Sequence, residues 1–418
     1  MSMMIVPIPL FDGDMAVEAY WLYAQDSSRI LGVKDNFLRM DGAFCHPALE
    51  TVEHIGLEPF AGSKRLFVPI TTTQLISGFL ESCQVGPKHL VCVLSPDCLQ
   101  YEQAIQEIYR LYGTGYQMAL MGYTEQWASS PVMGCVDYLI LDYTHPQFAK
   151  HYISARKLAD TKLVIYNVPD MNVYRVLKAD NTGYYTGSFY SRPITHASGE
   201  LSPIKINAMD LLAEINNEDF ELDRIVETVE RDPYLSVSLL RYLNSTAAGL
   251  SRQVESIQQA VTILGQTAVR RWAVIALSTT LGQDRPSEIT KLALVRAKFA
   301  EDIATAFHLG VFQSSLFMAG LFSLLDVMLE KPMEEAIKEV ALGKLVRVAL
   351  LEKQGPLAPV MELIYAYERA DWDKASVLMI QHDIDMGQIS RAYLDALIWY
   401  RKLLHSIDST ADSAQDTE

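Results

Sequence analysis

The rhythm of hydrophobic residues changes near residue 200, and this change constrains the fold more than any other feature of the chain. Up to about residue 195, short runs rich in β-branched and aromatic residues alternate with amphipathic stretches of helical period. From about residue 210 onward, apolar residues recur with the spacing of one helix face. The first such series is Leu222, Ile225, Val226 and Val229. The two rhythms predict an α/β domain followed by an all-α domain.

The first rhythm predicts a closed barrel of strands and helices. The candidate strands are Ile5–Phe11, Asn36–Met40, Arg65–Thr71, His89–Ser95, Gln117–Tyr123, Asp137–Tyr143, Lys162–Val168 and Gly183–Tyr190. Strands that alternate with helices in this number are typical of a TIM-like (β/α) barrel. The runs LVCVLS and DYLILDY are apolar on both faces, as expected of strands between a barrel interior and outer helices.

The second rhythm predicts helices up to residue 405. The expected helices after residue 265 are Thr267–Leu281, Ile289–His308, Ser314–Glu330, Met333–Lys353, Leu357–Arg369, Trp372–His382 and Met386–Leu404. Between the halves, a stretch rich in Pro, Gly and Ser is typical of a linker. We therefore expect a barrel domain at 1–195, a linker at 196–203, a helical domain at 204–405 and a disordered acidic tail at 406–418.

Composition excludes several classes of function. The net charge is −16, and Lys and Arg gather only in short pairs such as Lys64-Arg65 and Arg270-Arg271. A surface for nucleic acid needs clustered basic residues, so direct nucleic-acid binding is disfavoured. The chain has five Cys residues at irregular spacing and without a CxxC pair, which argues against a disulfide framework and a zinc site. We expect free thiols in a reducing cytoplasm.

The hydropathy pattern also argues against a membrane protein. We find no uncharged apolar window of about 18 residues that would suggest a span. The first residues, MSMMIVPIPLF, lack the basic segment and the cleavage site of a signal peptide.

The stretch from Arg231 to Gly265 carries the clearest motif of the helical half. Asp232 is an expected N-cap and Pro233 an expected first helical residue, and Gly265 suits a helix end. The pattern continues through Leu239-Leu240-Arg241, Asn244-Ser245, Ser256-Ile257, Ala260-Val261, Leu264-Gly265 and Arg270. This pattern resembles the HDOD module, a helical signalling domain related to the HD metal-dependent phosphohydrolases.

The resemblance implies an HD fold without its metal ligands. In HD enzymes a His-Asp pair follows a Gly-Leu-Leu-like turn, whereas here Ser323-Leu324 follows Gly320. A further His would be expected within 294–298, where the sequence reads LVRAK. Hydroxyl and isobutyl groups do not replace imidazole and carboxylate as metal ligands. The literal pair His382-Asp383 lies far from this position, and we interpret it as a helix boundary.

A recognition surface of the helical half is expected on a loop, because loops on rigid scaffolds often carry function. Our candidate interaction residues are Asn244, Ser245 and Arg252.

The first half resembles an EAL domain, the barrel family that hydrolyses cyclic di-GMP. The run YYTGSFYSRP at 184–193 is similar to the final strand and turn of that family, with Thr186 in the place of a Gln. The run DYLILD at 137–142 is similar to its Asp-x-x-Lys-x-Asp strand, with Ile140 in the Lys position and Asp142 kept.

The other residues that the resemblance implies for catalysis are replaced. Trp21 stands for a metal-binding Glu, Gln25 for an Arg that meets phosphate, and Pro69 for an Asn ligand. Met121 lies where a pair of metal-binding Asp residues is expected. Metal-assisted hydrolysis needs several carboxylates converging at the C-terminal end of the barrel. We therefore expect a barrel mouth filled by packed side chains, with no catalytic residue, cofactor or metal.

Together these resemblances imply a cytoplasmic bacterial signalling protein of EAL–HDOD architecture in which neither half is an enzyme. It would act as a scaffold or regulator through other signalling proteins, in or near cyclic di-GMP signalling, and the composition permits a homodimer. One alternative is a receptor that binds cyclic di-GMP without hydrolysis, which the residues at 25 and 186 disfavour. Another is a residual metal-dependent phosphodiesterase with relocated chemistry.

Overall fold

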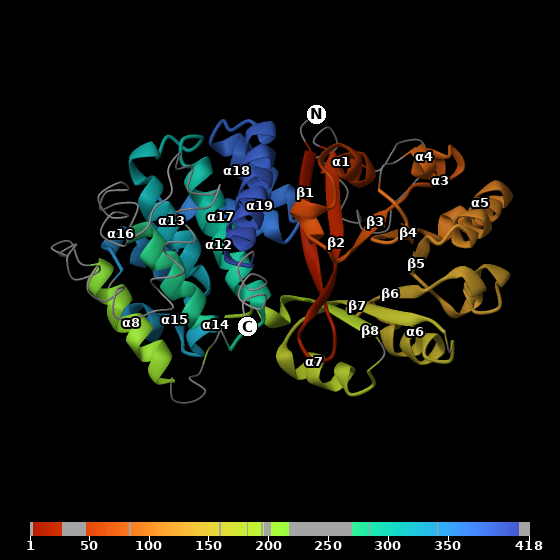
Figure 1. Cartoon of the computed structure of the whole chain (residues 1–418), viewed down its shortest axis with the longest axis horizontal. Helices are drawn as coiled ribbons and strands as arrows, with labels where there is room; N and C mark the ends of the chain where they lie inside the picture. The colour runs from red at the N-terminus through yellow and green to blue at the C-terminus, as the bar shows by residue number, and fades with distance from the viewer. Residues whose placement is uncertain are drawn as a thin grey trace, which may run out of the picture. The chain divides into compact units, whose positions relative to one another are not determined.

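The computed structural model of the chain contains two compact units (Figure 1). It describes residues 3–26, 47–82, 85–158, 160–181, 183–193, 195, 202–216, 270–282, 284–340 and 342–408. The barrel unit comprises Met1–Arg192 and Tyr365–Ser390, and the helical unit comprises Pro193–Ile364 and Arg391–Glu418. In this division residues 365–390 group with the barrel strands.

Eight strands close into a barrel in chain order. They are β1 (Met3–Phe11), β2 (Val17–Asp26), β3 (Arg65–Pro69), β4 (Leu90–Leu94), β5 (Gln117–Met121), β6 (Tyr138–Asp142), β7 (Lys162–Val168) and β8 (Gly183–Gly187). Seven of them overlap predicted strands. The exception is β2, which begins at Val17, whereas the strand predicted at Asn36–Met40 lies outside the described residues.

The direction of β1 departs from the expected strand–helix alternation. β1 runs antiparallel to β2 and β8, whereas the pairs from β2 through β8 are parallel. The turn between β1 and β2 is too short for a parallel crossover, which needs about a dozen residues. The Asp12 carboxylate fixes this turn by accepting hydrogen bonds from the backbone N–H of Asp14 at 2.8 Å and of Ala16 at 2.9 Å.

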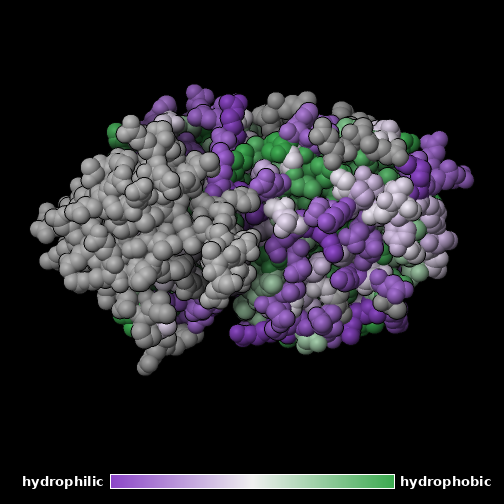
Figure 2. Space-filling model, in the orientation of Figure 1, coloured by the Kyte–Doolittle hydropathy of each residue, from purple (hydrophilic) through white to green (hydrophobic). Residues whose placement is uncertain are grey.

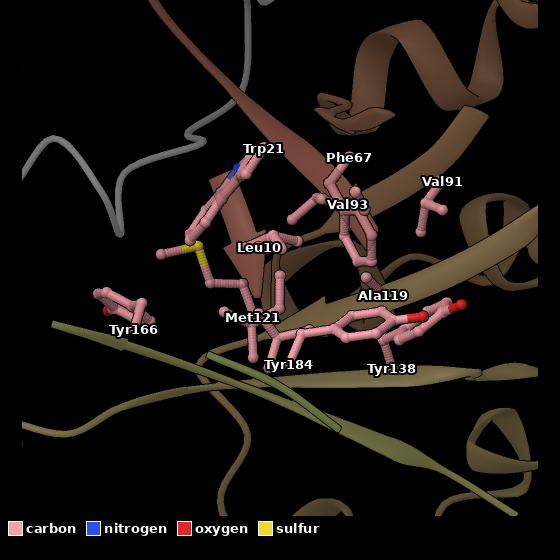
Figure 3. Close-up of a cluster of buried hydrophobic side chains, with 13 residues drawn as sticks. Leu10, Trp21, Phe67, Val91, Val93, Ala119, Met121, Tyr138, Tyr166 and Tyr184 are labelled. Atoms are coloured by element: carbon pink, nitrogen blue, oxygen red, sulfur yellow. The ribbon is translucent and has the colours of Figure 1, made fainter. Parts of the chain in front are cut away.

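The barrel interior is a packed apolar core (Figure 3). Its buried members are Leu10, Ala19, Trp21, Phe67, Val91, Val93, Ala119, Met121, Tyr138, Ile140, Val164, Tyr166 and Tyr184. They occupy alternate positions along the strands, because successive side chains point to opposite faces of a strand. The rings of Phe67 and Tyr138 meet edge to face at 4.9 Å, a favourable geometry for aromatic pairs.

The edge of β1 that faces away from β2 pairs with β8 and also receives a side chain from a distant segment. Within the described residues, β8 meets β1 at one pair, Phe11 and Tyr185. The backbone N–H of Ile5 instead donates to the Tyr367 hydroxyl at 3.2 Å. Since the direction of backbone groups alternates along a strand, Pro7 and Pro9 point to the same edge as Ile5. Proline has no N–H to leave unsatisfied, which suits an edge strand.

Short helices cover the outside of the barrel in Figure 1. They are α1 (Pro47–Ile55), α2 (Glu58–Ala61), α3 (Thr72–Ile76), α4 (Phe79–Ser82), α5 (Glu102–Gly113), α6 (Phe148–Ala155) and α7 (Met171–Lys178). Sequence features fix their starts: Thr71 and Gln74 form a capping box at α3, and the Asp170 side chain caps α7. On the face shown in Figure 2, the barrel surface is mainly hydrophilic, with an apolar area where Figure 1 draws α1.

The rest of the described chain is helical, as predicted. It forms α8 (Pro203–Asn216), a helix over 270–281, α12 (Ser287–Ile303), α13 (Gln313–Leu321), α14 (Leu325–Leu329), α15 (Met333–Glu339), α16 (Lys344–Arg347), a π-helical turn (Val348–Glu352), α17 (Ala358–Glu368), α18 (Trp372–Gln381) and α19 (Met386–Asp408). Two predicted helices, Ser314–Glu330 and Met333–Lys353, are interrupted. The first breaks where the Ser323 hydroxyl donates to the Gly320 carbonyl at 2.6 Å, a local bond that competes with helix pairing.

Helices α12 and α13 touch through a glycine. A Cβ atom added to Gly320 would lie 2.6 Å from the backbone of Ala297 and Arg296. Any side chain at this position would therefore push the two helices apart.

One segment of the described chain, Gly310–Leu329, is long and apolar enough to cross a membrane by length and composition alone. Its most apolar window is 61% buried within the fold, as the core helix of a globular protein is.

Candidate functional site

The positions that the EAL resemblance assigns to catalysis converge on the barrel interior. Trp21, Met121 and Ile140 all belong to the buried apolar cluster. In Figure 3 the Met121 side chain points toward the Trp21 side chain, and both belong to the same buried cluster. The Trp21 and Tyr166 rings meet edge to face at 5.6 Å. Buried side chains of one cluster therefore occupy the interior at these three positions.

Asp142 ends β6 and is the one carboxylate that the resemblance retains. Its Oδ1 atom accepts hydrogen bonds from the Thr144 backbone N–H at 2.9 Å, the Thr144 hydroxyl at 2.7 Å and the Asn167 amide at 3.0 Å. Asn167 adopts a left-handed backbone conformation with φ +60°, which Asn tolerates better than most residues. The carboxylate thus ties the loop after β6 to the end of β7.

Tyr166 links this carboxylate to the interior. Burial raises the pKa of the Tyr166 phenol, and the neighbouring Asp142 charge raises the pKa further. The neutral hydroxyl therefore remains a hydrogen-bond donor to Asp142. This arrangement leaves the Asp142 oxygens surrounded by donors, which is the environment of a structural carboxylate.

Two other replaced positions are also buried. Pro69 ends β3 inside the fold. The Thr186 side chain on β8 is 3% exposed, and its hydroxyl has no hydrogen-bond partner among the described residues. Gln25 lies on β2, and its side chain is outside the described part of the structure. Across the described residues, no group of three or more His, Cys, Asp or Glu side chains is placed to hold a metal.

The rim of the barrel carries a charged cluster that sequence reasoning missed. The His145 and His151 rings lie 5.0 Å apart, and Lys150 pairs with Glu125 at 3.2 Å. Burial lowers the pKa of His151, as do the nearby His145 and Lys150, against an opposing effect of Glu125. The signal was weak, because Glu125 begins a 3-10 helix after β5, whereas Lys150 and His151 lie on α6, and these residues share no motif.

In the helical unit the two positions assigned to HD metal ligands also meet. Arg296, within 294–298, donates a hydrogen bond to the Ser323 hydroxyl at 3.0 Å. Arg296 is 8% exposed. A guanidinium remains protonated and offers only donors, so it cannot ligate a cation. The sequence located both positions, but not the bond between them.

The remaining candidate residues have plainer roles. His382 ends α18, with its N–H bonded to the Ile380 and Leu378 carbonyls, so the predicted helix boundary is confirmed. Cys92, Cys98 and Cys135 are buried and form no disulfide bond, and burial raises the pKa of Cys98 to about 12. The interaction residues Asn244, Ser245 and Arg252, and the whole Arg231–Gly265 stretch, lie outside the described residues.

Comparison with known families identifies part of the chain. The HDOD domain model matches residues 201–344. This part is an HDOD domain. The match begins in the predicted linker, 196–203, and runs on into the predicted helical domain, and the HDOD resemblance is confirmed over these residues.

Two curated relatives extend the comparison. The uncharacterized protein YuxH of Bacillus subtilis is 28% identical over 97% of this chain and 99% of its own length. The cyclic di-GMP phosphodiesterase CdgJ of Vibrio cholerae is 29% identical over 52% of this chain and 50% of its own.

Solved structures with EAL domains show likeness over the barrel region. The EAL domain of FimX from Pseudomonas aeruginosa, bound to c-di-GMP, is 15% identical over 46% of this chain and 90% of that chain, with a TM-score of 0.34. A putative phosphohydrolase from Shewanella amazonensis is 17% identical over 50% of this chain and 94% of that chain, with a TM-score of 0.37.

Proposed function

We propose that this chain is a non-enzymatic regulator in or near cyclic di-GMP signalling that acts by binding other proteins. The observation that carries the proposal is the filled barrel interior. Trp21, Met121 and Ile140 are buried and belong to a single hydrophobic cluster. None of them offers an anionic oxygen, and metal-assisted phosphodiester hydrolysis needs several.

The geometry at Asp142 supports the same proposal. One of its carboxylate oxygens already accepts three hydrogen bonds from Thr144 and Asn167. A divalent cation prefers several oxygen ligands that are free to coordinate it. Asp142 instead connects the loop after β6 to the end of β7 by hydrogen bonds.

The helical unit supports the proposal independently. Arg296 places a permanent positive charge beside Ser323, where the HD resemblance expects metal ligands. A cation held at this position would be repelled by the guanidinium at short range. Both halves would therefore work as binding scaffolds with no cofactor.

The likeness to CdgJ, which is named a cyclic di-GMP phosphodiesterase, favours the signalling pathway. We propose that the chain works in the bacterial cytoplasm, that its partners are other signalling proteins, and that self-association as a homodimer is compatible with this role.

Turnover assays test the non-enzymatic part. Purified chain is incubated with cyclic di-GMP and with a generic phosphodiester in Mg²⁺ or Mn²⁺, beside purified CdgJ as a positive control. We expect the signal of a protein-free blank. Hydrolysis that follows the protein peak through a second column would overturn this part of the proposal.

Calorimetry with cyclic di-GMP separates a regulator from a receptor. We expect no heat of binding beyond dilution, because the interior is occupied by packed side chains. Micromolar, saturable binding would favour a receptor that binds the nucleotide without hydrolysis.

Reconstitution tests the protein-binding part. Full-length chain is used to capture partners from its native cells, and each candidate is then purified and titrated against the chain. We expect at least one stoichiometric complex, weakened by Arg252→Glu if the predicted interaction loop contributes. If every purified candidate fails to bind, the scaffold role is wrong.

A further inference from the structure

The edge of β1 that faces away from β2 is covered at Ile5 by a chain segment more than three hundred residues away. Ile5 and Tyr367 form a buried hydrogen bond at a sequence separation of 362. The Tyr23 ring of β2 stacks on Trp372 at 6.1 Å with an interplanar angle of 6°. Trp372 in turn meets Tyr367 edge to face at 5.1 Å. Two neighbouring strands are therefore held by two aromatic residues of one segment.

This cover fits an edge at which the described residues show one pair with β8, between Phe11 and Tyr185. Exposed strand edges invite pairing with other chains unless they are blocked. At Pro7 and Pro9 the edge has no donors, and at Ile5 the donor is satisfied by Tyr367. Tyr367 is fully buried and Trp372 is 4% exposed, so both side chains are packed against the strands and excluded from solvent.

The same segment is continuous with the helical unit. Helix α17 holds Ile364 in the helical unit and Tyr365 in the barrel unit, and α19 crosses back between Ser390 and Arg391. Val360, Leu363 and Ile364 on α17 are fully buried. Residues of one α-helix move together because successive turns are hydrogen-bonded. A shift of this buried face would therefore displace Tyr367.

We propose that residues 365–390 form a latch that covers the β1 edge near Ile5 and makes the order of that edge depend on the helical unit. This is a conformational device that the proposed regulatory function does not require. A regulator could bind partners with both units independent, and a latch could exist in an enzyme.

Hydrogen exchange of the full-length chain, resolved by peptide mass spectrometry, tests the cover. Tyr367→Phe removes the acceptor of the Ile5 N–H and should speed exchange at the β1 edge about tenfold, the order of one hydrogen bond. Trp372→Leu should also loosen β2 near Tyr23. Val377→Ala changes a half-exposed residue of the same helix α18 and serves as the matched control. Unchanged β1 exchange in both latch variants would overturn the cover.

A second variant tests the coupling. Gly320→Ala forces a clash between α12 and α13 in the helical unit. Gly343→Ala is its control, because a Cβ there meets nothing within 4 Å. We expect Gly320→Ala to speed exchange several-fold in α12, α13 and β1, and to leave β4 at the wild-type rate. Faster exchange in the helices with unaltered β1 would refute the coupling. These outcomes do not depend on cyclic di-GMP or on any partner.

Discussion

The barrel interior and the α12–α13 contact differ in what replaces the metal ligands that the family resemblances imply. In the barrel, Trp21 and Met121 fill the space with apolar side chains. In the helical unit, Arg296 and Ser323 form a buried hydrogen bond beside a glycine contact. The first set of positions is occupied by apolar packing, and the second by a fixed positive charge with a hydrogen bond. The barrel site should therefore respond to changes in volume, and the helical site to changes in polarity and close approach.

Removing bulk from the barrel interior should have the largest effect. Trp21 is 2% exposed, so Trp21→Ala leaves a cavity among Met121, Tyr166 and their neighbours. We expect the free energy of unfolding to fall by about 3–5 kcal/mol, measured by urea denaturation. Val176→Ala, at a residue that is 74% exposed, should change it by less than about 0.5 kcal/mol. A small change in the free energy of unfolding would show that the Trp21 side chain is not tightly packed in the barrel interior.

The second largest effect on the free energy of unfolding should come from Gly320→Ala, which adds one carbon atom at the contact between α12 and α13. In Gly320→Ala the new Cβ meets backbone atoms at 2.6 Å, and backbone cannot rotate away as a side chain can. Overpacking of this kind costs about 1–3 kcal/mol. Gly343→Ala should be neutral or slightly stabilising in the same denaturation experiment, because its Cβ would meet open space. Equal stability of the two variants would contradict the close approach.

A double-mutant cycle should isolate the polar replacement. Arg296→Met and Ser323→Ala each remove one partner of the hydrogen bond and keep most of the volume. We expect a coupling energy of about 0.5–1.5 kcal/mol between them. Ser376→Ala, which removes a hydroxyl bonded to a backbone carbonyl elsewhere, should show no coupling to Arg296→Met. Additive effects of Arg296→Met and Ser323→Ala would mean that the bond does not stabilise this contact.

The sequence predicted the parts of the fold that depend on local pattern. Strands such as β4 are apolar runs bounded by turn residues, and helices such as α18 begin and end at capping residues. It missed the reversed β1 because strand direction depends on the length of the turn that follows, and the second strand had been placed beyond that turn. It also missed the contact between Ile5 and Tyr367, since neither residue carries a local signal of a partner so distant in the chain.

In the candidate site, too, the sequence predicted positions along single strands but missed contacts between different elements. The positions of Trp21, Ile140 and Asp142 followed from motif spacing along single strands. The bonds of Asp142 to Asn167 and of Arg296 to Ser323 join different elements, and the geometry of such pairs is set by tertiary packing.

The rim of the barrel should supply a small pH dependence that its apolar interior cannot. The groups facing His151 are Glu125, His145 and Lys150, and burial lowers the pKa of His151 below its ordinary 6.5. The folded state then binds fewer protons than the unfolded state, so stability is full above pH 6.5 and falls as the pH drops below it. His151→Gln should flatten the difference in unfolding free energy between pH 7.5 and 5.5, whereas Val176→Ala, at an exposed residue of the barrel unit, should keep the wild-type difference. If His151→Gln keeps the wild-type difference in unfolding free energy between the two pH values, His151 is not the source of the pH dependence.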